Sequence, residues 1–94
     1  MHRLSKHARQ QCRIRRINSD LILQLLNGVE PTPQEICVIV HKAKQIYHRE
    51  GSSGDLVVAA CQNGIVKTVM LQHSWQVKNR GERLGKKYLD LTQK

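Results

Sequence analysis

The side chains with the clearest capacity for chemistry lie near the start of the chain. His7 is followed by Arg13 and Arg15, and residues 1–17 contain no Asp or Glu. An imidazole can move protons near neutral pH, and guanidinium groups hold phosphate oxygens through paired N–H donors. His7 is therefore a candidate general acid or base in RNA cleavage, with the arginines holding the scissile phosphate. A structural His7 that orients its helix is the alternative.

Two further candidates for a catalytic role lie in the second half of the chain. Thr68 belongs to a β-branched run and His73 follows its end, where a rigid strand could project a reactive group. An ordinary sheet residue and a surface histidine are the alternatives. His41 and His48 are seven residues apart, two helical turns rather than one, so they do not form a metal-binding pair. We predict no metal site and no cofactor.

The strongest signal for binding is the distribution of charge. Sixteen Lys and Arg residues against seven Asp and Glu residues give a formal charge of +9, which favours a polyanionic partner. On the first expected helix, four bases share one stripe and are assigned to nucleic-acid binding: Lys6, Arg9, Arg13 and Arg16. A solvated helix face is the alternative. Trp75 and Tyr88, in the basic C-terminal part, could stack on unpaired bases or pack against the sheet.

Two helices are expected in the N-terminal part. Residues 5–16 begin with Ser5, a suitable N-cap, and contain neither Gly nor Pro. Apolar residues recur at helical spacing over residues 19–27, where Asn27-Gly28 is typical of a left-handed C-cap.

The middle of the chain has two interpretations. Residues 36–40 form a β-branched run, which favours a strand there followed by a short helix at 41–50. A capping-box pattern beginning at Thr32 supports the rival interpretation, one continuous helix from Pro33 to Glu50.

The second half of the chain predicts a β-hairpin at residues 55–72. Two apolar runs flank Asn63-Gly64, a pair that suits a type I′ turn. We expect one α+β domain over residues 1–73, with the N-terminal helices packed on a small antiparallel sheet that contains the hairpin. Residues 74–94 are expected to form a basic C-terminal extension.

The location of the protein is also suggested by its sequence. Three widely spaced cysteines, Cys12, Cys37 and Cys61, resemble neither a zinc knuckle nor a redox pair, so we expect reduced, buried thiols. The N-terminus lacks the apolar run of a secretory signal, and no stretch is long and apolar enough to span a membrane. A cytoplasmic protein without a membrane partner is expected.

Both ends of residues 5–71 resemble a widespread family of small bacterial proteins of uncharacterised function. That family opens with the pattern His-Ala-x-x-Arg-x-x-x-Arg-Gly-Ile, which His7, Ala8, Arg15 and Ile17 match. Its closing hairpin, with Val-Val, a Gly-centred turn and Val-x-Thr-Val, is similar to residues 55–58 and 64–69. In the N-terminal pattern, the first Arg is replaced by Gln11 and the Gly by Arg16 in this chain.

The family is similar in organisation to the RelE-type and BrnT-type toxins, which are small basic ribonucleases. The resemblance implies a RelE/barnase-like fold and an RNA-binding protein that acts as a metal-independent endoribonuclease, with an acidic antitoxin as its protein partner. His7 or His73 would move protons, while Arg13 and Arg15 would stabilise the charge on the phosphorane.

Two other functions stay open. A non-catalytic module that binds RNA or another nucleic acid is favoured by Gln11, which replaces the first Arg. A small scaffold that binds a protein partner by strand addition to a sheet edge is the third interpretation.

Overall fold

The computed structural model describes residues 2–42 and 54–92. Within these ranges the chain forms an α+β fold with three α-helices and a five-stranded mixed sheet. The strands are β1 (Arg3–Leu4), β2 (Ile36–Lys42), β3 (Leu56–Gln62), β4 (Ile65–Gln72) and β5 (Tyr88–Asp90). The helices are α1 (Lys6–Ile14), α2 (Ser19–Leu25), which continues into the 3-10 turn η1 (Leu26–Gly28), and α3 (Ser74–Arg83).

The centre of the sheet is the predicted hairpin. Asn63 and Gly64 connect β3 to β4 with φ angles of 56° and 78°, as a type I′ turn requires. The strand order is β1-β4-β3-β2-β5, and β3 is antiparallel to both of its neighbours, β2 and β4. The edge strands β1 and β5 are parallel to their neighbours, so the sheet is mixed and the expectation of an antiparallel sheet was wrong at its edges.

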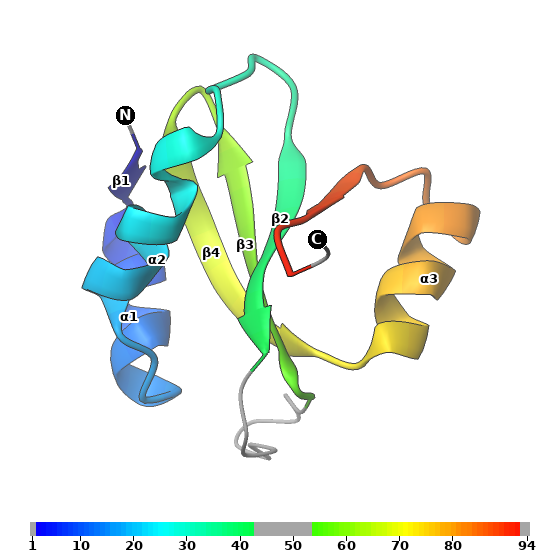
Figure 1. Cartoon of the computed structure of the whole chain (residues 1–94), viewed down its shortest axis with the longest axis horizontal. Coiled ribbons are helices and arrows are strands. Elements are labelled where there is room, and N and C mark those ends of the chain that lie inside the picture. Colours follow the sequence, from blue (N-terminus) through cyan, green and yellow to red (C-terminus); the bar gives the residue numbers. More distant parts are fainter. Residues whose placement is uncertain (1, 43–53, 93–94) are drawn as a thin grey trace.

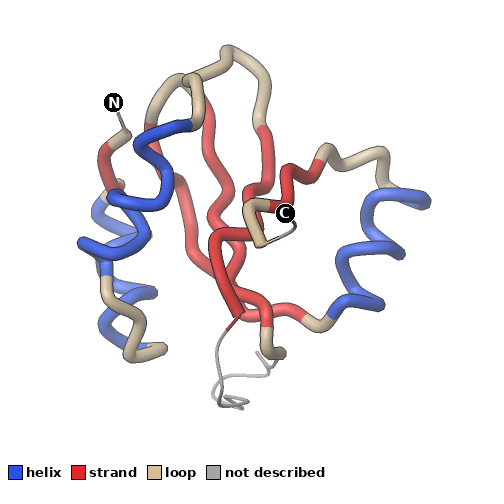
Figure 2. The backbone as a smooth tube through the Cα atoms, in the orientation of Figure 1, coloured by secondary structure: helices blue, strands red, loops and turns tan. Residues whose placement is uncertain are grey.

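The helices lie on opposite sides of the sheet (Figure 1). α1 and α2 lie together on the left and α3 lies on the right, with the strands between them (Figure 2). The first apolar cluster joins Ala8 and Cys12 of α1 and Ile22 of α2 to one face of β2, β3 and β4. The second cluster, on the other face, includes Val58 and is packed by Val77 of α3, Met70 and Tyr88; its full set of buried residues is Cys37, Ile39, Leu56, Val58 and Ala60.

The two N-terminal helices form at the expected places. The Ser5 side chain accepts a hydrogen bond from the Ala8 backbone N–H at 3.0 Å, as an N-cap should. Asn18 caps α2 through its side chain. The predicted left-handed C-cap at Gly28 was wrong, because Gly28 belongs to η1 and has no positive φ angle.

The middle segment is a strand over a longer range than expected. β2 continues through His41 and Lys42, because these residues pair with Val57 and Leu56 of β3. The helix predicted at 41–50 was therefore wrong for its first two residues, and residues 43–50 lie outside the described ranges. The rival helix over residues 33–50 was wrong across β2.

The C-terminal segment adds two elements to the fold. α3 follows β4 directly, and β5 pairs in parallel with β2 through Cys37–Tyr88, Val38–Leu89 and Ile39–Asp90. All three cysteines are free and buried, as expected. In the part of the chain that the structure describes, no helix is long and apolar enough to cross a membrane.

Candidate nucleic-acid interface

The position of α1 is fixed by the hydrogen bonds of its N-cap residue and by the burial of one side of the helix. The Ser5 Oγ atom donates a hydrogen bond to the backbone oxygen of Lys67 at 3.0 Å, and the Ser5 N–H donates to the Val66 oxygen at 3.0 Å. Ala8 and Cys12 lie on the buried side of the helix. These contacts hold α1 against β4, so the solvent face of α1 has a defined position.

The solvent face of α1 carries a basic stripe, defined as Lys6, Arg9, Arg13 and Arg16. All four residues are exposed. At about 100° per residue, the first three lie within about 60° of one another around the helix axis. Arg16 follows the helix with a left-handed φ of 55°, and its N–H donates to the Arg13 oxygen at 3.4 Å. Within residues 2–42 and 54–92, no ion pair involves any of the four.

Arg15 differs from the other arginines of this segment. It is the C-cap residue of α1 and is half-buried. Burial raises the pKa of the Cys12 thiol, and the positive charge of Arg15 opposes part of that rise. The Nη1 atom of Arg15 is itself buried, so Arg15 is less accessible to a large ligand than the basic stripe is.

His7 lies on α1 but outside the basic stripe. One residue after Lys6, it is rotated by about 100° around the helix, on the flank where Gln11 follows one turn later. His7 is exposed, and Gln11 is half-buried. The His7 imidazole is therefore accessible to solvent, but it points in a different direction from the side chain of Lys6, the neighbouring residue of the basic stripe.

Thr68 and His73 are separated from His7 by the sheet and by the length of β4. Thr68 is paired with Ala60, a residue of the second apolar cluster, so its side chain lies on the face opposite α1. His73 follows β4, whose eight residues extend for roughly 25 Å, whereas α1 begins beside the first residues of that strand. The structure therefore does not bring His7, Thr68 and His73 together.

A cluster of charged side chains that the sequence did not indicate lies on the same side of the sheet as Thr68. The Lys67 Nζ atom is 2.9 Å from Glu35 Oε2, and the Lys86 Nζ atom is 3.7 Å from Glu35 Oε1. The hydrogen bond from Lys67 holds the pKa of the Glu35 carboxyl below its usual value. These residues come from β4, the residue before β2, and the segment between α3 and β5, so no local pattern could have identified the cluster.

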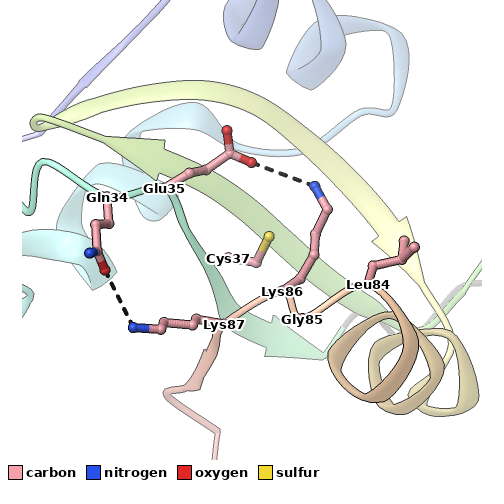
Figure 3. A pocket seen from close by; sticks show the side chains of 7 residues that line it. All are labelled: Gln34, Glu35, Cys37, Leu84, Gly85, Lys86 and Lys87. Carbon is pink, nitrogen blue, oxygen red and sulfur yellow. Dashed lines mark hydrogen bonds and ion pairs between the residues drawn. The ribbon is translucent and has the colours of Figure 1, made fainter.

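A shallow pocket of about 240 Å³ adjoins this cluster (Figure 3). Lys87 donates a hydrogen bond to Gln34 Oε1 at 3.3 Å at one side of the pocket, and Cys37 lies at its base. Burial raises the pKa of the Cys37 thiol, so the thiolate that nucleophilic chemistry requires is disfavoured. Lys67 and Lys86 both contact Glu35, and Lys87 contacts Gln34. The pocket therefore offers little free positive charge to an anionic ligand.

The described residues provide no group of three His, Cys, Asp or Glu side chains that could hold a metal ion. Comparison of the chain with family models, with curated proteins and with solved structures gave no match.

Proposed function

We propose that this protein binds RNA through the basic stripe of α1. The observation that carries the proposal is that Lys6, Arg9, Arg13 and Arg16 are exposed, close together and without an acidic partner among the described residues. Like charges held together repel one another, and a phosphate backbone relieves this repulsion while releasing its own counterions. Arginine forks also match the geometry of phosphate oxygens.

The contrast with the opposite side of the sheet supports this assignment. Lys67 and Lys86 share the carboxylate of Glu35, so their charges are partly neutralised within the protein. No ion pair neutralises the basic stripe within residues 2–42 and 54–92, and the chain has no Asp or Glu before residue 20. The basic stripe therefore offers an external polyanion four exposed cations that no carboxylate of the described residues neutralises.

The separation of the candidate catalytic residues favours binding without cleavage over the endoribonuclease hypothesis. General acid–base catalysis requires both groups within hydrogen-bond reach of one substrate. His7 and His73 lie near opposite ends of β4, and Thr68 lies on the other face of the sheet from α1. The RelE-like fold and the acidic antitoxin that the resemblance implies stay hypotheses, and the mixed α+β fold is compatible with them.

The test is binding of labelled single-stranded RNA of about 12 nucleotides, measured by fluorescence anisotropy at a series of salt concentrations. We expect affinity to fall steeply with salt. Replacing Lys6, Arg9 and Arg13 together by Ala should weaken binding and reduce the slope of log K against log salt by about 2, at about 0.7 per lost phosphate contact.

The matched control is Gln10→Ala, which removes an exposed neutral side chain from the same helix. This variant should bind RNA as the wild-type protein does. RNA affinity that is independent of salt, or unchanged in the triple variant, would contradict the proposal.

A further inference from the structure

The most exposed aromatic side chain in the described structure lies on the side of the sheet opposite the basic stripe. Trp75, the only tryptophan of the chain, is in the first turn of α3 and is 63% exposed. Its ring stacks on the imidazole of His73, with centroids 6.0 Å apart and planes inclined by 11°. The two rings are therefore nearly parallel, and most of the Trp75 side chain is open to solvent.

The orientation of α3 accounts for this exposure. Val77 is the residue of α3 that packs on the second apolar cluster. Two residues along a helix correspond to a rotation of about 200°, so Trp75 is on the face turned away from the sheet. Val77, Met70 and Tyr88 pack on this face of the sheet, and Trp75 is not part of either apolar cluster.

The stacked pair is held at a fixed point of the fold. His73 connects the end of β4 to α3, and its backbone N–H donates a hydrogen bond to Gln76 Oε1 at 2.7 Å. The imidazole restricts the rotation of the indole, which lowers the conformational entropy that a bound ligand would have to remove. The pair thus presents a preorganised flat apolar surface to solvent.

Positive charge lies beside this surface. Lys78 follows Trp75 by three residues, a spacing that makes the two side chains neighbours on one helix face. Lys78 is exposed and has no ion pair among the residues that the structure describes. Glu82, one turn beyond Lys78, is the acidic side chain of α3. An aromatic plane beside a free cation matches a nucleotide, which combines a flat base with a phosphate.

We propose that Trp75 stacks on an unpaired base of single-stranded RNA while Lys78 contacts an adjacent phosphate. This inference rests on the proposed function and adds to it a second contact site, on the opposite side of the sheet from α1 (Figure 1). It also specifies the substrate class, because the bases of a duplex are stacked on one another and cannot lie on Trp75.

The test uses the tryptophan fluorescence of the 94-residue chain, which reports on Trp75 because it is the one tryptophan of the sequence. Titration with an unlabelled single-stranded oligouridylate of about 12 nucleotides should quench the emission, with the same midpoint as anisotropy of the labelled oligonucleotide. An RNA duplex of equal length should bind through α1 with little quenching. Trp75→Leu should weaken single-stranded binding by about 5-fold to 100-fold, and Trp75→Phe should retain part of the affinity.

The matched control is Leu84→Ala, because Leu84 is 65% exposed and lies just after α3. It should leave RNA affinity unchanged, whereas Lys78→Gln should weaken binding several-fold. Salt-dependent RNA binding without quenching, or with equal affinity in Trp75→Leu, would overturn the stacking site while leaving the function of α1 intact. Equal losses of RNA affinity in Trp75→Leu and Leu84→Ala would also overturn the stacking site. A nonspecific apolar surface, of the kind that suits a protein partner, would then explain both losses. Failure of the wild-type protein to bind RNA at low salt would overturn both proposals.

Discussion

The Lys67 ammonium group contacts the Glu35 carboxylate at 2.9 Å, although the two residues are 32 positions apart in the chain. A β-bulge accounts for this approach. β4 pairs Val66 with Cys61 and Thr68 with Ala60, which leaves Lys67 as the extra residue between two paired positions. A bulge redirects the side chain of the extra residue, and Lys67 reaches across β3 to the residue before β2. The ion pair thus ties the hairpin to β2.

The Glu35 carboxylate should make stability depend on pH at the acid end. Its pKa is lowered by the Lys67 hydrogen bond from a usual value of 4.5, so its contribution is present above pH 4.5 and is lost as the pH falls through the lower folded-state pKa. Because both side chains are more than one third exposed, Glu35→Gln should lower the free energy of unfolding by less than about 1 kcal/mol near pH 7.

Urea denaturation of the wild-type protein and Glu35→Gln, at about pH 7 and at several values below pH 4.5, measures this difference. The two curves should converge as the pH falls. Glu30→Gln is the control, because Glu30 is exposed and forms no ion pair with the described residues. A difference that grows in acid would show that Glu35 acts in its neutral form.

Gly54 should be the glycine that is least tolerant of a side chain. Its φ angle is 142°, and an added Cβ would overlap the Gln72 backbone carbonyl and lie 2.6 Å from the Gln72 Cα atom. Backbone atoms of a paired strand cannot move aside without breaking β3–β4 contacts. Gly54→Ala should therefore lower the free energy of unfolding by about 2 kcal/mol or more.

Gly28→Ala provides the comparison, because a Cβ at Gly28 would meet no atom within 4 Å. Thermal melting of both variants should show a large decrease for Gly54→Ala and a small change for Gly28→Ala. Similar melting temperatures would mean that the segment around Gly54 can shift away from β4.

Local chemistry explains which parts of this fold could be predicted from the sequence. The hairpin was predicted because Asn63 and Gly64 tolerate positive φ angles, and α1 because Ser5 offers a cap ahead of a segment without Gly or Pro. The parallel edge strands were missed because their pairing depends on distant partners, such as the Arg3 N–H with the Gly64 oxygen at 2.9 Å. β2 was predicted too short because His41 and Lys42 are polar residues held in the strand by β3.

The candidate site shows the same division. Spacing alone placed Lys6, Arg9 and Arg13 on one helix face, since that relationship is local. Sequence could not show that Arg15 is half-buried, because that depends on how α1 packs. It also could not show that Val77 would take the inner face of α3 and leave Trp75 exposed.

Replacement of Arg13 should mainly affect RNA affinity, whereas replacement of Arg15 should mainly affect folding stability. Arg13 is exposed on the basic stripe, so Arg13→Ala should weaken RNA binding several-fold, uniformly across RNA sequences, with a change in stability within about 0.5 kcal/mol. Arg15 is half-buried at the end of α1, so Arg15→Ala should cost about 1 kcal/mol of folding free energy through lost packing. RNA affinity and urea denaturation of both variants measure the two effects. The reverse pattern would place Arg15 rather than Arg13 at the interface.

The last prediction concerns His7 and decides between binding and cleavage. The His7 side chain is exposed and makes no hydrogen bond with the described residues, so His7→Ala should leave the melting temperature nearly unchanged. If His7 were a general acid or base, the same variant would slow RNA cleavage by about 10²-fold to 10⁴-fold while retaining RNA affinity. We expect no cleavage by the wild-type protein, because neither Thr68 nor His73 lies near His7.

The measurement is incubation of wild-type protein and His7→Ala with single-stranded RNA and with ribosome-bound RNA, in the presence of a chelator, alongside melting and affinity. Cleavage by the wild-type protein that His7→Ala abolishes would establish the endoribonuclease hypothesis and contradict binding without cleavage. Cleavage that persists in His7→Ala would exclude His7 as the general acid or base and would favour a group on the opposite side of the sheet from α1. A large decrease in the melting temperature of His7→Ala would instead support the structural interpretation. No such decrease is expected, because an exposed side chain without partners contributes little to stability.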